Sequence, residues 1–233
     1  MTPRLLVLDR YHLGDPLFPR ALARVVRGGV GPLMIVHDSG DAGERALEAT
    51  GALVERRDGA LVTGTIEEKA LVERAVREQN RQIAHELTEE QVSTVRVMGT
   101  DRGLLRLEGG ALHVGRTDWL ATLAAQGAVP VVGGLAASLE GPVEVDATRA
   151  ALALGAALGT PPELLYLARD TRGGVRRAGA PVAELPAAEL AEHDVPGSAG
   201  ARAALAAGAA VWAVSFTGLR PGTTEGATRL TTL

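Results

Sequence analysis

The stretch GPLMIVHDSGDAGERALEAT, residues 31–50, contains the pattern that decides the fold class. Its first part, GPLMIVH at 31–37, is an aliphatic run with the length of a buried strand. The cluster Asp38-Ser39-Gly40-Asp41 predicts a turn, and residues 42–50 have a helical pattern that Gly51 ends. A short buried strand that leads directly into a helix is typical of an α/β fold.

The same alternation extends in both directions along the chain. Aliphatic runs at 4–8, 128–132 and 164–168 predict three further central strands. A long charged helix is expected over 66–87, where apolar residues form a stripe. Together these patterns predict a mostly parallel sheet flanked by helices. The other predicted elements are helices at 19–27, 117–126, 146–158 and 199–207, strands at 92–98, 210–216 and 227–230, and a hairpin at 102–113.

Composition excludes several classes of protein. A chain of 233 residues with 46% hydrophobic residues is long enough for one large domain with its own core. It has no cysteine, which excludes disulfides and thiolate chemistry and fits a cytoplasmic protein. The net charge of −4 favours no nucleic-acid partner, and no apolar run reaches the length of a membrane span. The first nine residues also lack the apolar core of a signal peptide. Only one of the 24 basic residues is a lysine, Lys69.

The turn after the 31–37 strand has two interpretations. A strand–turn–helix unit can present backbone N–H groups to an anion. However, Asp38 and Asp41 would repel a phosphate, and they are better suited to accept the unpaired N–H groups at the start of the helix. We favour the capping interpretation and keep the ligand loop as the alternative.

Two other features are candidates for a site, and the histidines are not. Asp146 opens a helix, and we interpret it as an N-cap in preference to a base. The loop Arg169-Asp170-Thr171-Arg172-Gly173-Gly174 follows a predicted parallel strand, where ligands of α/β sheets commonly bind, but an ordinary polar turn would look the same. The five histidines have no metal-ligand spacing, so no metal site is predicted.

In the order of its elements the chain resembles the amino-acid kinase family, most closely the acetylglutamate kinases. The resemblance implies a three-layer αβα sandwich with a mainly parallel central sheet. Within this single domain, residues of about 1–160 would bind the acyl substrate and residues of about 161–233 the nucleotide. The stretches that carry the resemblance are 78–87 (EQNRQIAHEL), 97–106 (VMGTDRGLLR), 114–132 (VGRTDWLATLAAQGAVPVV), 145–159 (VDATRAALALGAALG), 164–175 (LLYLARDTRGGV) and 224–230 (TEGATRL).

The family resemblance also implies an activity. Acetylglutamate kinases phosphorylate the side-chain carboxylate of N-acetyl-L-glutamate with ATP and Mg²⁺, a step of arginine biosynthesis, and the resemblance implies a homodimer, for which we consider the 66–87 helix as an interface. The matching positions are His37, Asp38, Ser39 and Gly40 for the phosphate loop, Leu61, Glu144, Asp146 and Thr148 for substrate binding, and Arg169, Asp170, Thr171, Arg172, Gly173 and Gly174 for the nucleotide.

Several of these positions depart from the family pattern. The lysine and glycine pair at the end of the first strand are replaced by Leu8-Asp9-Arg10-Tyr11. The second lysine falls near Gly200, with Arg202 two residues further on. The substrate-binding arginine becomes Leu61, and the organising aspartate becomes Thr148. Arg10 and Arg202 are therefore the candidate catalytic cations, although a planar guanidinium does not replace an ammonium geometrically.

Three hypotheses follow. The first is an acetylglutamate kinase, whose activity we expect to be slow or lost because phosphoryl transfer depends on neutralising charge. The second is a non-catalytic relative that binds a metabolite, a nucleotide or a protein partner with a regulatory effect. The third is a kinase whose carboxylate substrate has changed, for example to one on a carrier protein.

Overall fold

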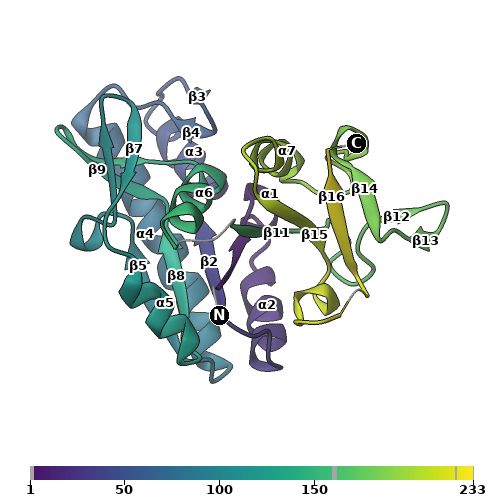
Figure 1. Cartoon of the computed structure of the whole chain (residues 1–233). Coiled ribbons are helices and arrows are strands. Elements are labelled where there is room, and N and C mark those ends of the chain that lie inside the picture. The colour runs from purple at the N-terminus through teal and green to yellow at the C-terminus, as the bar shows by residue number, and fades with distance from the viewer. Residues whose placement is uncertain (1–2, 159–161, 224, 233) are drawn as a thin grey trace.

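A mainly parallel sheet of eight strands forms the centre of the protein (Figure 1). The computed structural model describes residues 3–158, 162–223 and 225–232. The sheet order is β14-β16-β15-β11-β1-β2-β8-β5. The four strands expected at the centre are neighbours and run parallel: β11 (Glu163–Leu167), β1 (Arg4–Val7), β2 (Leu33–His37) and β8 (Val129–Gly133). The α/β fold predicted from the sequence is confirmed.

The remaining strands extend this sheet or form smaller ones. Strands β5 (Thr94–Met98) and β15 (Ala210–Val214) continue the parallel arrangement, whereas β16 (Ala227–Thr231) is antiparallel to β15 and pairs with β14 (Glu184–Pro186). A four-stranded sheet contains the predicted hairpin, and two short hairpins stand alone. These strands are β6 (Leu105–Glu108), β7 (Ala111–Val114), β9 (Leu135–Ser138) and β10 (Gly141–Glu144), then β3 (Arg56–Arg57) with β4 (Ala60–Leu61), and β12 (Arg176–Arg177) with β13 (Ala180–Pro181).

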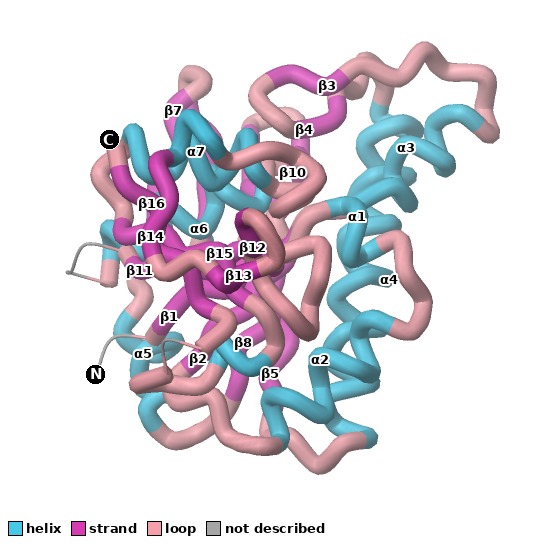
Figure 2. Tube along the Cα trace, turned by 90° about the vertical axis from the view of Figure 1, so that its right-hand side faces the viewer, coloured by secondary structure: helices cyan, strands magenta, loops and turns pink. Residues whose placement is uncertain are grey.

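Helices cover both faces of the large sheet and complete three layers. In Figure 2, α1 to α4 lie along one side of the strands, while α6 and α7 lie on the other. The helices are α1 (Arg10–Leu13), α2 (Phe18–Arg27), α3 (Gly40–Glu48), α4 (Ile66–Glu89), α5 (Asp118–Ala125), α6 (Ala147–Ala157) and α7 (Ser198–Ala206), with short 3₁₀ turns at Asp101–Gly103, Ala187–Glu189 and Thr217–Leu219.

Strand β1 shows why the central strands are aliphatic throughout. Its side chains alternate between the two faces. Leu5 and Val7 join the core that includes α6 and α7, whereas Leu6 and the following Leu8 join the core that includes α2. All four are buried because both faces of the sheet are covered.

Helix α4 confirms the long helix predicted over 66–87. It begins at a capping box in which Thr65 and Glu68 satisfy each other's backbone N–H groups. Its apolar stripe, which includes Val76 and Ile83, is buried inside the chain. The exposed side carries charged residues such as Arg77. The apolar stripe therefore packs into the core of the same chain. Association of two copies through this helix stays a prediction.

Some expectations fall on residues outside the described ranges. The expected boundary between the substrate and nucleotide parts, near 160 and 161, lies there. So do Gly159 and Thr224, each at one end of a stretch that carries the family resemblance. Among the helices of the described residues, none has the length and apolar character needed to cross a membrane.

Candidate small-molecule site at the strand ends

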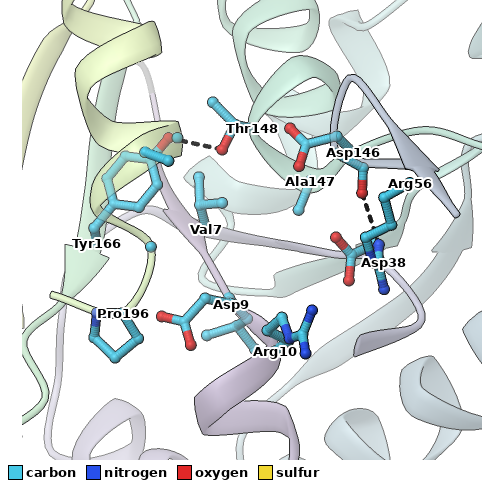
Figure 3. Close-up of a pocket in the computed structure, with 15 residues that line it drawn as sticks. Val7, Asp9, Arg10, Asp38, Arg56, Asp146, Ala147, Thr148, Tyr166 and Pro196 are labelled. Atoms are coloured by element: carbon cyan, nitrogen blue, oxygen red, sulfur yellow. Dashed lines mark hydrogen bonds between the residues drawn. The ribbon is translucent and has the colours of Figure 1, made fainter. Parts of the chain in front are cut away.

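A cavity of about 220 Å³ opens where the parallel strands β1 and β2 end (Figure 3). The segment after β1 contributes Asp9 and Arg10, and the end of β2 contributes Asp38. The first residues of α6 and α7 close the opposite wall, with Tyr166 of β11 between them. This is the place where ligands bind in open α/β sheets.

The predicted phosphate loop is occupied by the chain's own carboxylates. The Gly40 N–H donates to Asp38 Oδ1 at 2.8 Å, and the Ser39 N–H donates to Glu144 Oε1 at 2.9 Å. These are N–H groups that an anion would need at the start of α3. Asp38 therefore accepts the first N–H of α3, but the N-cap is Ser39, whose side chain makes no capping hydrogen bond, so neither Asp38 nor Asp41 is the N-cap that the sequence predicted. Asp41 instead pairs with Arg10, with 3.0 Å between Arg10 Nε and Asp41 Oδ1.

His37 is a buried structural residue and does not line the cavity. Its Nδ1 lies 2.9 Å from the carbonyl oxygen of Asp38, and its Nε2 lies 3.1 Å from Nδ2 of Asn80. Burial lowers the pKa of His37 to about 4, so the ring is neutral at physiological pH.

The pKa of Asp38 is shifted in the opposite direction. Burial is the largest cause that raises its pKa to about 7, and the nearby carboxylates Glu144 and Asp146 contribute to the same rise. The Gly40 N–H and the Arg56 guanidinium act against this rise. Asp38 is therefore a carboxyl group that changes charge near physiological pH.

Arg56 is the central cation of the site, and the sequence patterns did not indicate it. It lies on the β3–β4 hairpin and enters the cavity beside Asp38 (Figure 3). Its Nε donates to Glu44 Oε1 at 2.7 Å, while Nη1 and Nη2 donate to the carbonyl oxygens of Gly59 and Gly40 at 2.6 and 2.9 Å. Only the Asp58-Gly59 pair, a common turn signal, marks the hairpin in the sequence.

Leu61 and Glu144 support the site from behind. Leu61 does not line the cavity, because its side chain packs with Leu47 and Val72 in a small apolar cluster. Its N–H donates to Glu144 Oε2 at 2.8 Å. The Glu144 side chain is fully buried, and its Oε2 lies 3.9 Å from Arg56 Nη1. The arginine expected at position 61 by resemblance thus has no equivalent there, and Arg56 supplies the positive charge from another strand.

Asp146 and Thr148 are both in the cavity wall. Asp146 is the N-cap of α6, since Oδ1 accepts from the Arg149 N–H at 2.9 Å, as predicted. Burial raises the pKa of Asp146. Thr148 Oγ1 accepts a 3.0 Å hydrogen bond from the Tyr166 hydroxyl, whose pKa is raised by burial. The threonine hydroxyl is therefore partnered within the protein.

The two candidate catalytic arginines differ in position. Arg10 lines the cavity, but it is held by Asp41 and by Glu44 Oε1, which lies 3.1 Å from Nη1. Arg202 does not line the cavity, and its Nη1 donates to the carbonyl oxygen of Leu190 at 2.7 Å. The structure thus places one of the two at the site.

The 169–174 loop lies at a second cavity of about 460 Å³. Arg169 and Thr171 line it together with Tyr11, His12 and Phe216, and the Arg169 guanidinium lies 4.4 Å from the centre of the Tyr11 ring. The other four residues, Asp170, Arg172, Gly173 and Gly174, do not line it. Asp170 Oδ1 accepts from the Arg172 N–H at 3.0 Å, and the backbone N–H groups of the turn lower the pKa of Asp170. Asp9–His12 connects the two cavities.

No set of three or more His, Asp or Glu side chains within residues 3–158, 162–223 and 225–232 is placed to hold a metal ion. The carboxylates around the first cavity are therefore not arranged as a metal site.

Comparison with solved structures defines the fold class. One similar structure is N-acetylglutamate synthase from Neisseria gonorrhoeae, solved with coenzyme A and N-acetyl-glutamate. The alignment covers 98% of this chain and 59% of that chain, with a TM-score of 0.69 and 20% sequence identity. Aspartate kinase from Synechocystis gives a TM-score of 0.64 at 17% identity over 99% of this chain and 40% of the other. An isopentenyl phosphate kinase gives a TM-score of 0.59 at 16% identity, and the alignment covers 97% of this chain and 99% of the other. The architecture is that of the amino-acid kinase fold.

Sequence relatives narrow the class further. The acetylglutamate kinase of Rubrobacter xylanophilus is 35% identical over 181 residues, which cover 74% of this chain and 69% of that protein. The acetylglutamate kinase of Chloroflexus aggregans is 31% identical over 255 aligned positions, covering 96% of both. The chain belongs to the acetylglutamate kinase family. No family model matches it.

Proposed function

We propose that this protein binds a small molecule in the strand-end cavity and transfers phosphate from ATP to N-acetylglutamate very slowly or not at all. The family relation supports the scaffold and the place of the site. The charge distribution of the cavity supports the loss of the reaction. The single observation that carries the proposal is that both arginines of the cavity are already paired with acidic groups of the chain.

Phosphoryl transfer is mostly positioning and neutralisation of the charge on the moving group. Here Arg56 and Arg10 both contact Glu44, and Arg10 also contacts Asp41. The N–H groups of Ser39 and Gly40 are taken by Glu144 and Asp38. The residues present therefore do not fit a triphosphate with its Mg²⁺ ion, and we assign no step of a phosphoryl transfer to them.

The lysines of the related enzymes have no substitute at this site. Lys69, the chain's single lysine, lies on α4 and contacts Glu140, with 2.6 Å between Nζ and Oε2. It is not among the residues that line the cavity. Loss of one preorganised donor typically lowers a rate by about 10²–10³, and two partly additive losses give on the order of 10⁴ or more.

An assay of ADP release tests the proposal. The purified protein is incubated with ATP, Mg²⁺ and N-acetylglutamate, and the rate is compared with that of a sample lacking N-acetylglutamate. We expect equal rates in the two samples. A turnover near the enzyme median of about 10 s⁻¹ would overturn the proposal, and it would mean that an arginine reaches the phosphate in another conformation or from a second copy.

A further inference from the structure

We propose that the strand-end cavity binds a small organic molecule through an ammonium or guanidinium group held between Asp38 and Asp146. This inference rests on the proposed function, because it names the class of ligand that the cavity takes. It depends on three features of the cavity, namely an unpaired carboxylate oxygen, the pairing of its cations and the apolar character of its walls.

The first feature is Asp38. The residue is only 9% exposed, and it lines the cavity. Oδ1 accepts from the Gly40 N–H, whereas Oδ2 has no hydrogen-bond or ion-pair partner in the described part of the chain. Figure 3 shows this carboxylate and that of Asp146 at the same end of the cavity. This oxygen is not enclosed by the protein, so it can accept a hydrogen bond from a molecule in the cavity.

The second feature is the distribution of charge. The lining contains the carboxylates of Asp9, Asp38 and Asp146 and the guanidinium groups of Arg10 and Arg56. Asp9 contacts the buried His12, with 2.9 Å between Oδ2 and Nδ1, and both arginines pair with acidic residues outside the lining. Within the described residues, Asp38 and Asp146 form no ion pair of their own, and Arg56 beside Asp38 only partly offsets their charge. They attract a cation and repel dicarboxylates and phosphates.

The third feature separates an organic cation from a metal ion. Within the described ranges, the acidic side chains are not grouped closely enough to form a metal-binding set of three. The wall between the carboxylates and α7 includes Val7, Ala147 and Pro196, which fit a short carbon chain. A cavity of about 220 Å³ is suited to a ligand of amino-acid size.

Isothermal titration calorimetry with a matched set of probes tests the inference. Agmatine carries a guanidinium and an ammonium group on a four-carbon chain, and glutarate is an anion of similar length. We expect agmatine to bind with a dissociation constant of about 1 mM or below, which is ordinary for a ligand of this size, and glutarate and N-acetylglutamate to bind at least ten-fold more weakly.

Two isosteric variants assign the binding to the cavity. Asp38→Asn and Asp146→Asn each remove one charge, and asparagine caps a helix as well as aspartate does, so Asp146→Asn keeps the cap of α6. Each should weaken agmatine binding about ten-fold or more. The control is Asp118→Asn on the exposed start of α5, which should leave the affinity unchanged. Thermal unfolding confirms that each variant is folded.

The possible results separate this inference from the proposed function. Absence of agmatine binding, stronger binding of glutarate, or equal affinity in Asp38→Asn and Asp118→Asn would overturn the inference while leaving the result of the ADP assay untouched. Turnover of N-acetylglutamate would overturn the proposed function, and the agmatine titration would still decide the ligand class.

Discussion

Asp38 places a carboxyl group in the loop that the family resemblance assigns to phosphate. Three surroundings act on its charge, namely burial, the acidic neighbours Glu144 and Asp146, and the opposing Arg56 and Gly40 N–H. Their sum raises its pKa to about 7. The residue therefore converts a loop that could bind an anion into one that is neutral in mild acid and negative in mild base.

The raised pKa of Asp38 predicts a pH dependence of stability. A carboxyl whose pKa is higher in the folded than in the unfolded protein stabilises the fold below pH 3.8, and this stabilisation is lost as pH rises through about 7. Relative to Asp38→Asn, the wild-type free energy of unfolding should fall by about 2–3 kcal/mol between pH 5 and pH 8. Urea denaturation of both proteins at the two pH values measures it.

The comparison with the variant is needed because His37 acts in the opposite direction. Its pKa is lowered to about 4, so its contribution to stability is lost as pH falls from about 6.5 towards 4. This contribution is common to both proteins and cancels. Equal pH dependence in the wild type and Asp38→Asn would contradict the prediction.

Arg56 is expected to be the most important cation for stability at the site. Its side chain is 20% exposed and donates to Glu44 and to two carbonyl oxygens. Arg56→Gln leaves the buried Glu144 and Asp38 without nearby positive charge. We expect a loss of about 2–4 kcal/mol in the free energy of unfolding, slightly less than for a fully buried pair.

The neighbouring Arg57 is a matched control for this prediction. Its side chain is 72% exposed. Within the described residues, Glu55 is the one acidic residue with which it forms an ion pair. Arg57→Gln should change stability by no more than about 0.5 kcal/mol. Chemical denaturation that gives equal losses for the two variants would show that Arg56 has no special role.

At the scale of elements, the β3–β4 hairpin positions Arg56 and depends on one glycine. Gly59 has φ of +82°, and a Cβ there would lie 2.5 Å from Asp146 Oδ2. Gly59→Ala should therefore destabilise the protein through backbone strain and through the clash with the N-cap of α6. Gly51 has φ of +79° with no atom within 4 Å of a built Cβ, so Gly51→Ala measures the strain alone.

We expect Gly51→Ala to cost about 1–2 kcal/mol in the free energy of unfolding and Gly59→Ala to cost clearly more. Denaturation curves of the two variants provide the comparison. If both variants lose the same free energy of unfolding, the close approach of the hairpin to Asp146 adds nothing to the cost of the Gly59→Ala substitution.

The same hairpin shows where prediction from the sequence ends. Strands such as β2 and β8 were predictable because long aliphatic runs are needed wherever both faces of a sheet are covered. Asp146 was predictable as a cap because capping is a local interaction. The hairpin strands have two residues each, and Arg56 reaches the site only because the hairpin folds back over α6. A contact between residues about ninety positions apart leaves no local pattern.

At the scale of the whole molecule, the parallel strands bring distant segments to one edge of the sheet. Asp9, Asp38 and Tyr166 come from three adjacent strands or the residues after them and meet in one cavity. The topology thus predicts where the site lies, and the side chains decide its chemistry.

Association of two copies is a further prediction from the family resemblance. Because the apolar stripe of α4 is buried within the chain, a dimer formed through this helix would use charged residues such as Arg77 and Arg81. Such an interface should weaken as salt rises. Light scattering at micromolar concentration and low salt should report a dimer, and a monomer under these conditions would contradict it.

The nucleotide prediction also belongs to this scale, because the 169–174 loop and the strand-end cavity are joined through Asp9–His12. If ATP binds, we expect it at the second cavity, where Arg169 can reach a phosphate and Tyr11 offers an aromatic face. Asp170 holds the turn through the Arg172 N–H, and the Arg172 side chain is exposed at the loop. Asp170→Ala and Arg172→Ala should each weaken ATP binding several-fold in calorimetry, whereas Arg106→Ala in the separate four-stranded sheet should not. Unchanged affinity in both loop variants would place the nucleotide elsewhere. If the strand-end cavity repels phosphate as proposed, ATP bound in this way lies beside that cavity without reaching into it.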